Sequence, residues 1–383
     1  MITTIVFSIV IFSFIITGII LLVFCNKKEN FKREPLNDDM YITFSLTAND
    51  VKKLGGIPSN KYSGCAGFIH CRMCLTNLIK LARLVDRKVI LPPPWLYLHT
   101  NHNKGRKLPK DVKWSRYFDF SEYINNNEMA PETGKYLIHE YEPRRGYIED
   151  VKYIEPNTSV DDIKKIDDQV IVLHFYSGWG GEKKNGSWKC GGKEIGGGIG
   201  IAWHRKDKVI KFPPSKLVKD YATDIINQYL DDNFIIIHAR RGDILTKNLD
   251  HCKNNKAFDY WGFNCEEISN ATSPDNIKKV LSEISNDKNI SIFLMSNEDD
   301  SKYFDELKKT YKNLVTEYDI KQFQDIEKEL KDQFLIYEIS REIGERANKR
   351  IATHPCYFED NGQKCEYKLT DYIKRTKKKD DGK

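Results

Sequence analysis

The stretch FIIIHARRGD, residues 234–243, is an apolar run that passes directly into charged residues. A short apolar run rich in β-branched residues is typical of a strand buried on both faces of a sheet. Open α/β sheets bind ligands at the carboxyl ends of their strands, which is where the charged residues of this stretch fall. The stretch therefore predicts a parallel sheet with a ligand site after this strand.

The residues that follow the strand suit a phosphorylated ligand. The guanidiniums of Arg240 and Arg241 match a doubly charged diphosphate, which arginine grips through paired hydrogen bonds. Gly242 lets the backbone turn sharply beside a ligand, and Asp243 can orient an arginine. The residues alone leave a second interpretation open, a surface basic pair with a coincidental Arg-Gly-Asp triplet.

Apolar segments elsewhere in the chain alternate between strand-like and helix-like patterns. Strands are expected near residues 89–91, 171–173, 234–237 and 292–295, and helices near 71–85, 217–229, 304–314 and 332–347. This alternation predicts an α/β protein with parallel sheets. The proline-bounded stretch near residues 205–215 divides it into domains at 41–210 and 211–360, followed by a charged tail at 361–383.

Two stretches between these elements are expected to be irregular. Residues 178–200 are so rich in glycine that they predict a surface loop or a mobile lid and no regular element. Residues 296–300, Ser-Asn-Glu-Asp-Asp, form a second loop at the carboxyl end of a strand. By themselves they are most simply the cap of the following helix.

The amino-terminal residues predict one transmembrane helix. No residue from Ile2 to Phe24 is charged. A helix of that length would be about 35 Å long, enough to cross the ~30 Å hydrocarbon core of a bilayer. The start lacks basic residues and the end lacks a small-residue cleavage site, which favours an uncleaved signal-anchor at 2–24 over a signal peptide. Residues 25–40 are polar and form the expected stem.

Charge and glycosylation signals leave the orientation of this anchor open. Basic residues follow the span and none precedes it, so the positive-inside rule would hold the bulk of the chain in the cytosol. Four glycosylation sequons, at Asn157, Asn185, Asn270 and Asn289, decide little, because about three would arise by chance in a chain this rich in asparagine.

Composition excludes several classes of protein. The chain has 383 residues, of which 40% are hydrophobic, so it can bury a sizeable core and is not disordered throughout. Its 61 basic and 55 acidic residues give a net charge of +6, too small to argue for nucleic acid as a partner. Nine cysteines are too few for a disulfide-stapled mini-fold.

Other reactive residues give weaker signals. His70, Cys71 and Cys74 have the residue types of a metal site, but Cys71 lies on the apolar face of the predicted helix, which favours a core role. His174 follows an apolar strand and is more simply a core histidine than a base. We find no metal-binding motif and expect no metal cofactor.

Several segments together resemble the GDP-fucose-dependent fucosyltransferase superfamily, and most closely the protein O-fucosyltransferases. The segment His238-Ala-Arg240-Arg241-Gly242-Asp243 is similar to their His-x-Arg-Arg-Gly-Asp motif. Further similar segments are GFIHCR at 67–72, LARL at 81–84, RKVILPP at 87–93, FSEY at 120–123, MSNED at 295–299 and the helix and strand at 332–353. The resemblance covers residues 41–360.

This resemblance implies a fold and an activity. The fold would be GT-B-like, with two Rossmann-like domains and the donor, GDP-fucose, in the cleft between them. The reaction would be metal-independent and inverting, with a protein or glycan hydroxyl as the acceptor. The enzyme would be a type II single-pass membrane protein with its catalytic domain in the lumen of the ER or Golgi apparatus.

The resemblance also implies roles for individual residues. Arg240 would be the catalytic residue that stabilises the leaving diphosphate, and Arg241 and Asp243 would position it. The other expected donor-binding residues are His238, Arg241, Gly242, Asp243, Arg72, Ser296, Asn297, Glu298 and Thr353. His70 and His174 are candidates for the general base, and the residues do not decide between them.

Two loops differ from the family pattern, and they keep two alternatives open. Ile69, His70 and Cys71 stand where the family usually has an Asn-Gln pair, and Ser-Asn-Glu stands where it usually has Thr-Asp. The alternatives are a GT-B-like transferase that uses another nucleotide sugar, and a catalytically inactive module of the same fold that binds GDP.

Overall fold

The structure is a computed structural model that describes the chain in segments. The described residues are 39–45, 68–92, 94, 98, 103–109, 111–132, 151–153, 160–174, 188–190, 193–195, 212–241, 245, 265–298, 300–353 and 365–371. Within these segments no helix is long and apolar enough to cross a membrane. The predicted anchor at 2–24 and most of the predicted stem lie outside them.

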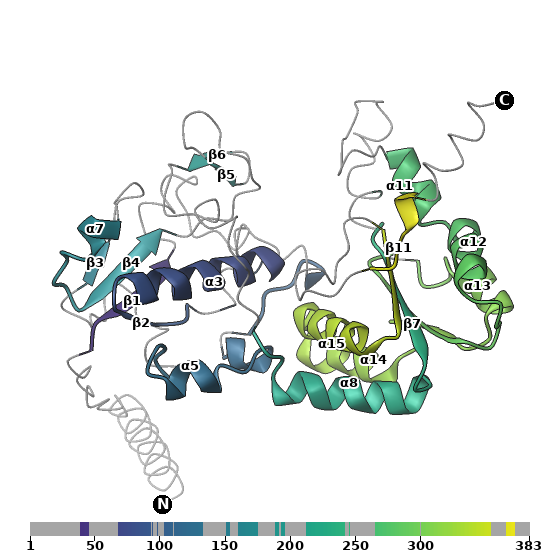
Figure 1. The fold of residues 1–383 in the computed structure, drawn as a ribbon, viewed down its shortest axis with the longest axis horizontal. Helices are drawn as coiled ribbons and strands as arrows, with labels where there is room; N and C mark the ends of the chain where they lie inside the picture. Colours follow the sequence, from purple (N-terminus) through teal and green to yellow (C-terminus); the bar gives the residue numbers. More distant parts are fainter. Residues whose placement is uncertain are drawn as a thin grey trace, which may run out of the picture.

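The amino-terminal part is built on a four-stranded parallel sheet (Figure 1). Its strands, in spatial order, are β2 (Lys88–Val89), β1 (Tyr41–Ser45), β4 (Val170–His174) and β3 (Val151–Tyr153). The accompanying helices are α3 (Phe68–Leu84), η2 (Trp114–Arg116), α5 (Ser121–Asn125) and α7 (Val160–Ile163). Helix α3 packs on β1 and β2 with the buried face that its apolar spacing predicts.

The carboxyl-terminal part is built on a five-stranded parallel sheet. Its spatial order is β11 (Tyr367–Lys368), β10 (Lys349–Ala352), β7 (Phe234–Ala239), β8 (Ser291–Ser296) and β9 (Leu314–Thr316). Its helices are α8 (Lys216–Tyr229), α11 (Cys265–Ala271), α12 (Pro274–Ile284), α13 (Asp305–Thr310), α14 (Lys321–Asp325), the π-helix η4 (Ile326–Leu330) and α15 (Gln333–Arg346). Two parallel sheets with helices confirm the predicted α/β class.

The first four residues of strand β7 are apolar because helices cover both faces of the strand. Phe234 and Ile236 belong to the core that includes α8 and α15, whereas Ile235 and Ile237 belong to the core under α12 and α13. All six residues of the strand are buried. Since side chains alternate between the faces of a strand, a strand covered on both sides needs an unbroken apolar run.

The structure corrects three expectations about elements. Residues 178–200 contain an antiparallel hairpin of β5 (Trp188–Cys190) and β6 (Lys193–Ile195), so the glycine-rich stretch is not wholly irregular. The helix predicted for 304–314 ends at Thr310, and Leu314 instead begins strand β9. The predicted boundary at 210/211 lies outside the described residues.

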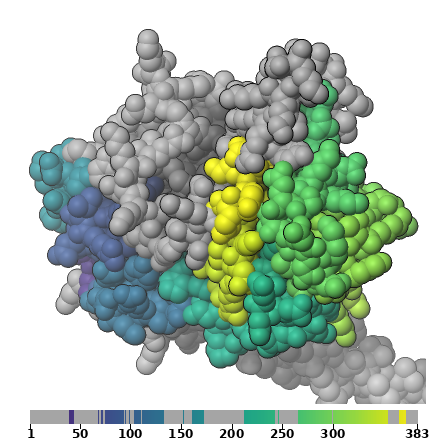
Figure 2. Space-filling view, turned by 45° about the vertical axis from the view of Figure 1, so that its right-hand side comes forward, coloured from purple at the N-terminus to yellow at the C-terminus, as the bar shows by residue number. Residues whose placement is uncertain are grey.

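The third correction concerns the predicted charged tail at 361–383. Tyr367 and Lys368 form β11, which pairs with β10 and extends the carboxyl-terminal sheet. In the space-filling view the carboxyl-terminal end of the described chain, in yellow, lies beside green residues that precede it in sequence (Figure 2). A two-residue strand has no periodicity to detect, and its structure comes from pairing with Ile351 and Ala352.

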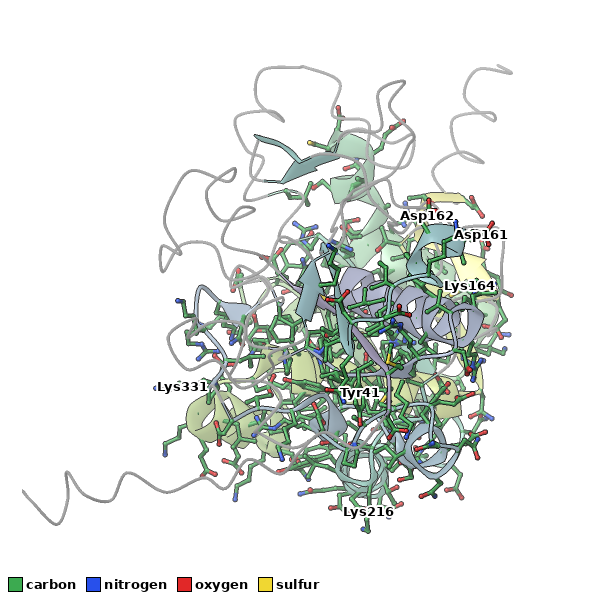
Figure 3. All side chains as sticks on the ribbon, turned by 90° about the vertical axis from the view of Figure 1, so that its left-hand side faces the viewer. Tyr41, Asp161, Asp162, Lys164, Lys216 and Lys331 are labelled. Atoms are coloured by element: carbon green, nitrogen blue, oxygen red, sulfur yellow. The ribbon has the colours of Figure 1, made fainter. Side chains whose placement is uncertain are left out.

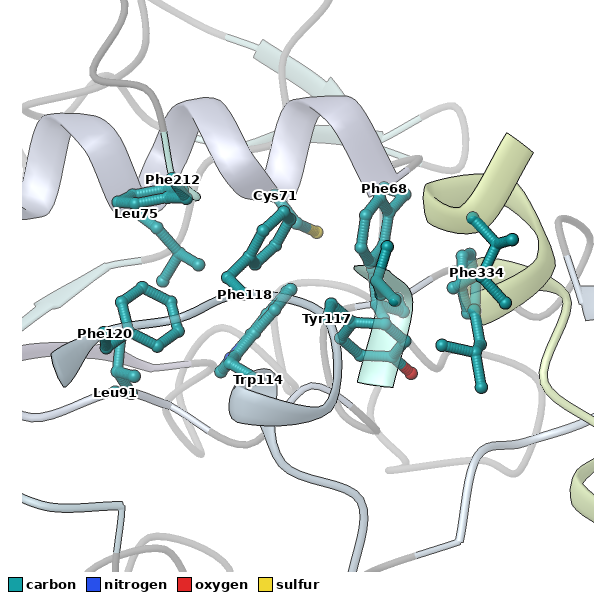
Figure 4. Packing of buried hydrophobic residues seen from close by; sticks show 14 of the residues in the cluster. Phe68, Cys71, Leu75, Leu91, Trp114, Tyr117, Phe118, Phe120, Phe212 and Phe334 are labelled. Carbon is teal, nitrogen blue, oxygen red and sulfur yellow. The ribbon is translucent and has the colours of Figure 1, made fainter. Parts of the chain in front are cut away.

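An aromatic cluster joins the two sheets at the amino ends of α3 and α15 (Figure 4). The ring of Phe68, in α3, stacks on Phe334, in α15, with 5.5 Å between the ring centroids. Phe68 also packs edge-on against Tyr117 at 5.1 Å. A helix that leads into a parallel strand starts near the carboxyl ends of that sheet. The cluster therefore fixes the amino-terminal part close to the edge where the ligand site is predicted.

A buried polar link lies next to this cluster. Asp332 is fully buried, and its Oδ2 accepts hydrogen bonds from Arg116 Nη1 at 3.1 Å and from the Tyr117 hydroxyl at 2.9 Å. Its Oδ1 accepts from the amide of Leu335 at 3.1 Å and caps α15. Lys331, with φ 53°, turns the chain from η4 into this cap, and its side chain points outward (Figure 3).

Candidate functional site

The predicted site residues of the carboxyl-terminal part gather at the carboxyl ends of three neighbouring strands. Strand β7 lies between β10 and β8, and His238 pairs with Ala352 on one side and with Met295 on the other. Thr353 therefore follows β10 beside the end of β7, and Ser296 ends β8 there. Residues separated by more than 50 positions in sequence meet because their strands are parallel and adjacent.

Polar side chains of the neighbouring strands hold the main chain at the end of β7. The amide of Arg240 donates to Thr353 Oγ1 at 2.9 Å, and this hydroxyl donates to the carbonyl of His238 at 3.0 Å. The Ser296 hydroxyl donates to the carbonyl of Ala239 at 2.7 Å. These hydrogen bonds of Thr353 and Ser296 are with backbone groups, so the two side chains hold the main chain at the end of β7 in place.

The next amide is held from the opposite side. The amide of Arg241 donates to Asn297 Oδ1 at 2.9 Å, and Asn297 itself is exposed. The two arginine amides are thus bound by β10 on one side and by the loop after β8 on the other. This bracing fixes the backbone from which the Arg240 side chain extends.

The two arginines differ in their surroundings. Arg240 is half-buried, whereas Arg241 is buried and forms an ion pair through Nε with Glu298. Arg241 Nη1 also donates to Thr272 Oγ1 at 3.1 Å, and its Cζ lies 3.8 Å from the centroid of the Tyr303 ring. Protein groups thus surround the Arg241 guanidinium, and a joint grip of both arginines on a diphosphate stays a prediction.

Glu298, in the loop after β8, also makes contacts within the protein, and its binding of a donor stays a prediction. Its side chain is buried against Arg241, its Oε1 accepts from the amide of Asp300 at 3.2 Å, and its carbonyl accepts from the Tyr318 hydroxyl. The idea that residues 296–300 cap the next helix is wrong, because α13 starts at Asp305 after Phe304 and without a side-chain cap.

Other predicted residues have the following positions. His238 is buried on β7, and Arg72 is buried in α3, in the amino-terminal part; the contact of Arg72 with a donor stays a prediction. Gly242 and Asp243 lie outside the described residues, as do the side chains of His70, Cys74 and His174. Cys71 is buried, in agreement with a core role.

One ionisable residue at this edge was not identified from the sequence. Glu317 follows β9, and burial raises its pKa to about 7, although hydrogen bonds from Ser340 and from the Ser296 backbone oppose the rise. The Ser340 hydroxyl donates to its Oε1 at 3.0 Å. The pattern at 304–314 predicts a helix through Leu314, so the sequence does not indicate the strand that leads to Glu317. Within the described residues no group of acidic, histidine or cysteine side chains could hold a metal ion.

Comparisons with known proteins give low similarity. No family model and no curated protein matches the chain. A crystal structure of POFUT1 in complex with GDP-fucose matches with a TM-score of 0.44 and 13% identity, over 87% of this chain and 98% of that one. NodZ alpha-1,6-fucosyltransferase co-crystallized with GDP matches with a TM-score of 0.43 and 9% identity, over 85% and 93%. At such values the function of this chain must be argued from its own residues.

Proposed function

We propose that this chain is a glycosyltransferase that transfers fucose from GDP-fucose to a hydroxyl group of a protein or a glycan. The observation that carries the proposal is the position of Arg240, half-buried and directly after the buried strand β7 at the carboxyl edge of a parallel sheet. Ligands bind at this edge in open α/β sheets, and the motif located there resembles that of fucosyltransferases. Two parallel sheets support a GT-B-like arrangement with the donor on the carboxyl-terminal sheet.

Arg240 is the proposed catalytic residue. In the transfer, the acceptor oxygen bonds to the anomeric carbon of the sugar while the bond from that carbon to the β-phosphate oxygen breaks. The electron pair of the broken bond stays on the diphosphate, and the proton of the acceptor hydroxyl passes to a base or to solvent. A guanidinium stabilises the negative charge that develops on the diphosphate, so the scheme requires no metal ion.

The proposal includes a membrane anchor at residues 2–24 and a catalytic part in the lumen of the secretory pathway. The uncharged run of sequence supports the anchor. Cys265 and Cys365 are disulfide-bonded, which supports an oxidising compartment, because disulfides rarely persist in the cytosol.

Substitution of Arg240 tests the mechanism. The variant Arg240→Ala is expected to lower kcat/KM for GDP-fucose at least about 100-fold, the usual effect of removing one group that stabilises a developing anion. The measurement is GDP release by the full-length chain with acceptor present, with and without a chelator. Arg346→Ala is the control, because Arg346 ends α15, far along the helix from the site. Unchanged turnover in Arg240→Ala would overturn the mechanism.

A panel of donors separates the proposal from its alternatives. Release of GDP from GDP-fucose, and none from other nucleotide sugars, supports the fucosyltransferase. Turnover of a different donor would show a transferase with another sugar. Tight binding of GDP without turnover of any donor would show a module that binds the nucleotide only.

A further inference from the structure

The guanidinium of Arg241 connects the end of β7 with three other residues of the carboxyl-terminal part. It forms an ion pair with Glu298 after β8, a hydrogen bond with Thr272 after α11 and a cation–π contact with Tyr303. Both members of the ion pair are only 8% exposed. A buried arginine needs such partners, because an unpaired charge is costly to remove from water.

These contacts lie on one face of the sheet. Ile235, Ile237 and Ala239 of β7 belong to the core under α12 and α13, and α11 contributes Ala271 to the same core. Thr272 directly follows Ala271, so the Arg241 side chain is anchored on this face. Successive side chains at the end of a strand point to opposite faces. An anchored Arg241 therefore turns Arg240 toward the other face, which His238 shares with Phe234 and Ile236.

We propose that Arg241 is a positioning residue, held by Glu298, Thr272 and Tyr303, that fixes the backbone and orientation of Arg240 and does not bind the diphosphate itself. The inference rests on the proposed function, since it assigns the catalytic contact to Arg240. Glu298 and Tyr303 then act on the reaction only through Arg241. The adjacent arginines of the motif thus have different roles: Arg240 contacts the ligand, and Arg241 contacts other residues of the protein.

Amide hydrogen exchange on the full-length chain tests the positioning without any ligand. The amides of Arg240 and Arg241 are hydrogen-bonded to Thr353 and Asn297, so they are protected while the turn is held. Glu298→Gln removes the charge from the ion pair and is expected to raise the exchange rate of both amides at least tenfold. The matched control is Glu306→Gln, on the exposed surface of α13. In this variant both amides should exchange at the rates of the unchanged chain.

Kinetics test whether the positioning reaches Arg240. Glu298→Gln is expected to lower kcat at least tenfold with less than a threefold change in the donor KM, because the contact that is lost stabilises the transition state. In an Arg240→Lys background the same substitution should lower kcat less than twofold, since the residue that it positions is already altered. Tyr303→Leu, which removes the ring over the guanidinium together with the hydroxyl that bonds to Arg241, should lower kcat three- to fivefold.

The outcomes separate this inference from the proposed function. An equal loss of kcat from Glu298→Gln in both backgrounds, or a raised KM with unchanged kcat, would show that Glu298 or Arg241 contacts the donor directly and would overturn the inference. Unchanged amide exchange in both Glu298→Gln and Tyr303→Leu would overturn it too. If the unchanged chain turns over no donor, the proposed function fails, and the exchange rates still decide whether the turn is held in this way.

Discussion

Arg240 and Arg241 are neighbours with the same side chain, and their surroundings separate them. Arg241 lies among an acid, a hydroxyl and an aromatic ring, whereas Arg240 is half-buried at the carboxyl edge of the sheet. Glu317 illustrates the same dependence on environment. Glu317 keeps some solvent exposure, but protein atoms surround its carboxyl group. This burial raises its pKa from an ordinary 4.5 to about 7. At this scale the environment, rather than the residue type, determines the chemistry.

Glu317 predicts a specific pH dependence of stability. Because its pKa is raised, the folded state favours the neutral acid, and the resulting contribution to stability is complete below pH 4.5 and is lost as the pH rises toward 7. Glu317→Gln cannot ionise and keeps an acceptor for Ser340, so it should be more stable than the unchanged chain at pH 8, by up to about 3 kcal/mol, and about equal at pH 4.5. Thermal unfolding at the two pH values measures the difference. The same pH dependence in both proteins would contradict the assignment, and Glu306→Gln is the exposed control.

Helix α15 shows how one element serves both its own stability and the assembly of the molecule. Asp332 accepts the Leu335 amide as the N-cap and also binds Arg116 and Tyr117 from the amino-terminal part. Burial raises the pKa of Asp332, and the hydrogen bonds from Arg116 and Tyr117 oppose this rise. The start of α15 is therefore determined by a contact over more than 200 positions of sequence as well as by local capping.

Replacing the cap residue separates these two contributions. Asp332→Asn retains an oxygen for the cap but places an amide group beside two hydrogen-bond donors. It should therefore lower the free energy of unfolding by about 2–4 kcal/mol, no more than the loss expected on breaking a buried ion pair. Ser273 caps α12 through the amide of Asn276 at 3.2 Å, and Ser273→Ala should cost about 1 kcal/mol as a cap alone. Chemical denaturation of both variants measures the costs. Equal costs would show that the links to Arg116 and Tyr117 contribute nothing.

The described residues include two parallel sheets, joined by the cluster around Phe68, and the sequence predicts an anchor at 2–24. The orientation of this anchor in the membrane decides whether the rest of the chain is exposed to the cytosol or to the lumen. Asn270 is exposed at the end of α11, within a glycosylation sequon whose Thr272 is buried against Arg241. A luminal orientation would expose Asn270 to glycosylation and Cys265 and Cys365 to oxidation.

Expression of the full chain in eukaryotic cells tests the orientation. Enzymatic removal of N-glycans should shift the unchanged chain on a gel, and Asn270→Gln should remove one step of that shift while leaving Thr272 in place. Cys265 and Cys365 should react with a thiol reagent only after reduction. A band that does not move, together with Cys265 and Cys365 thiols that react before reduction, would show that the part of the chain after residue 40 faces the cytosol.

The sequence by itself determined the features that depend on local pattern. The apolar run of β7 predicted a buried parallel strand, and the spacing of Leu75, Leu78 and Ala82 predicted the buried face of α3. The prediction of a loop at 296–300 was also local, since this segment, like the Arg pair, follows an apolar strand. Such patterns can be read because burial imposes the period of a strand or helix on consecutive residues.

Only the tertiary structure decided how the site residues are used. Thr353, Ser296 and Asn297 hold the backbone at the end of β7, and Tyr303 covers Arg241, although each is far from the arginines in sequence. Strand β11 likewise exists through its pairing with β10. A hydrogen bond, an ion pair or a ring contact depends on distances between side chains that the sequence does not contain. For this reason the motif predicted where a ligand would bind, and the packing around it decided which arginine would face the protein.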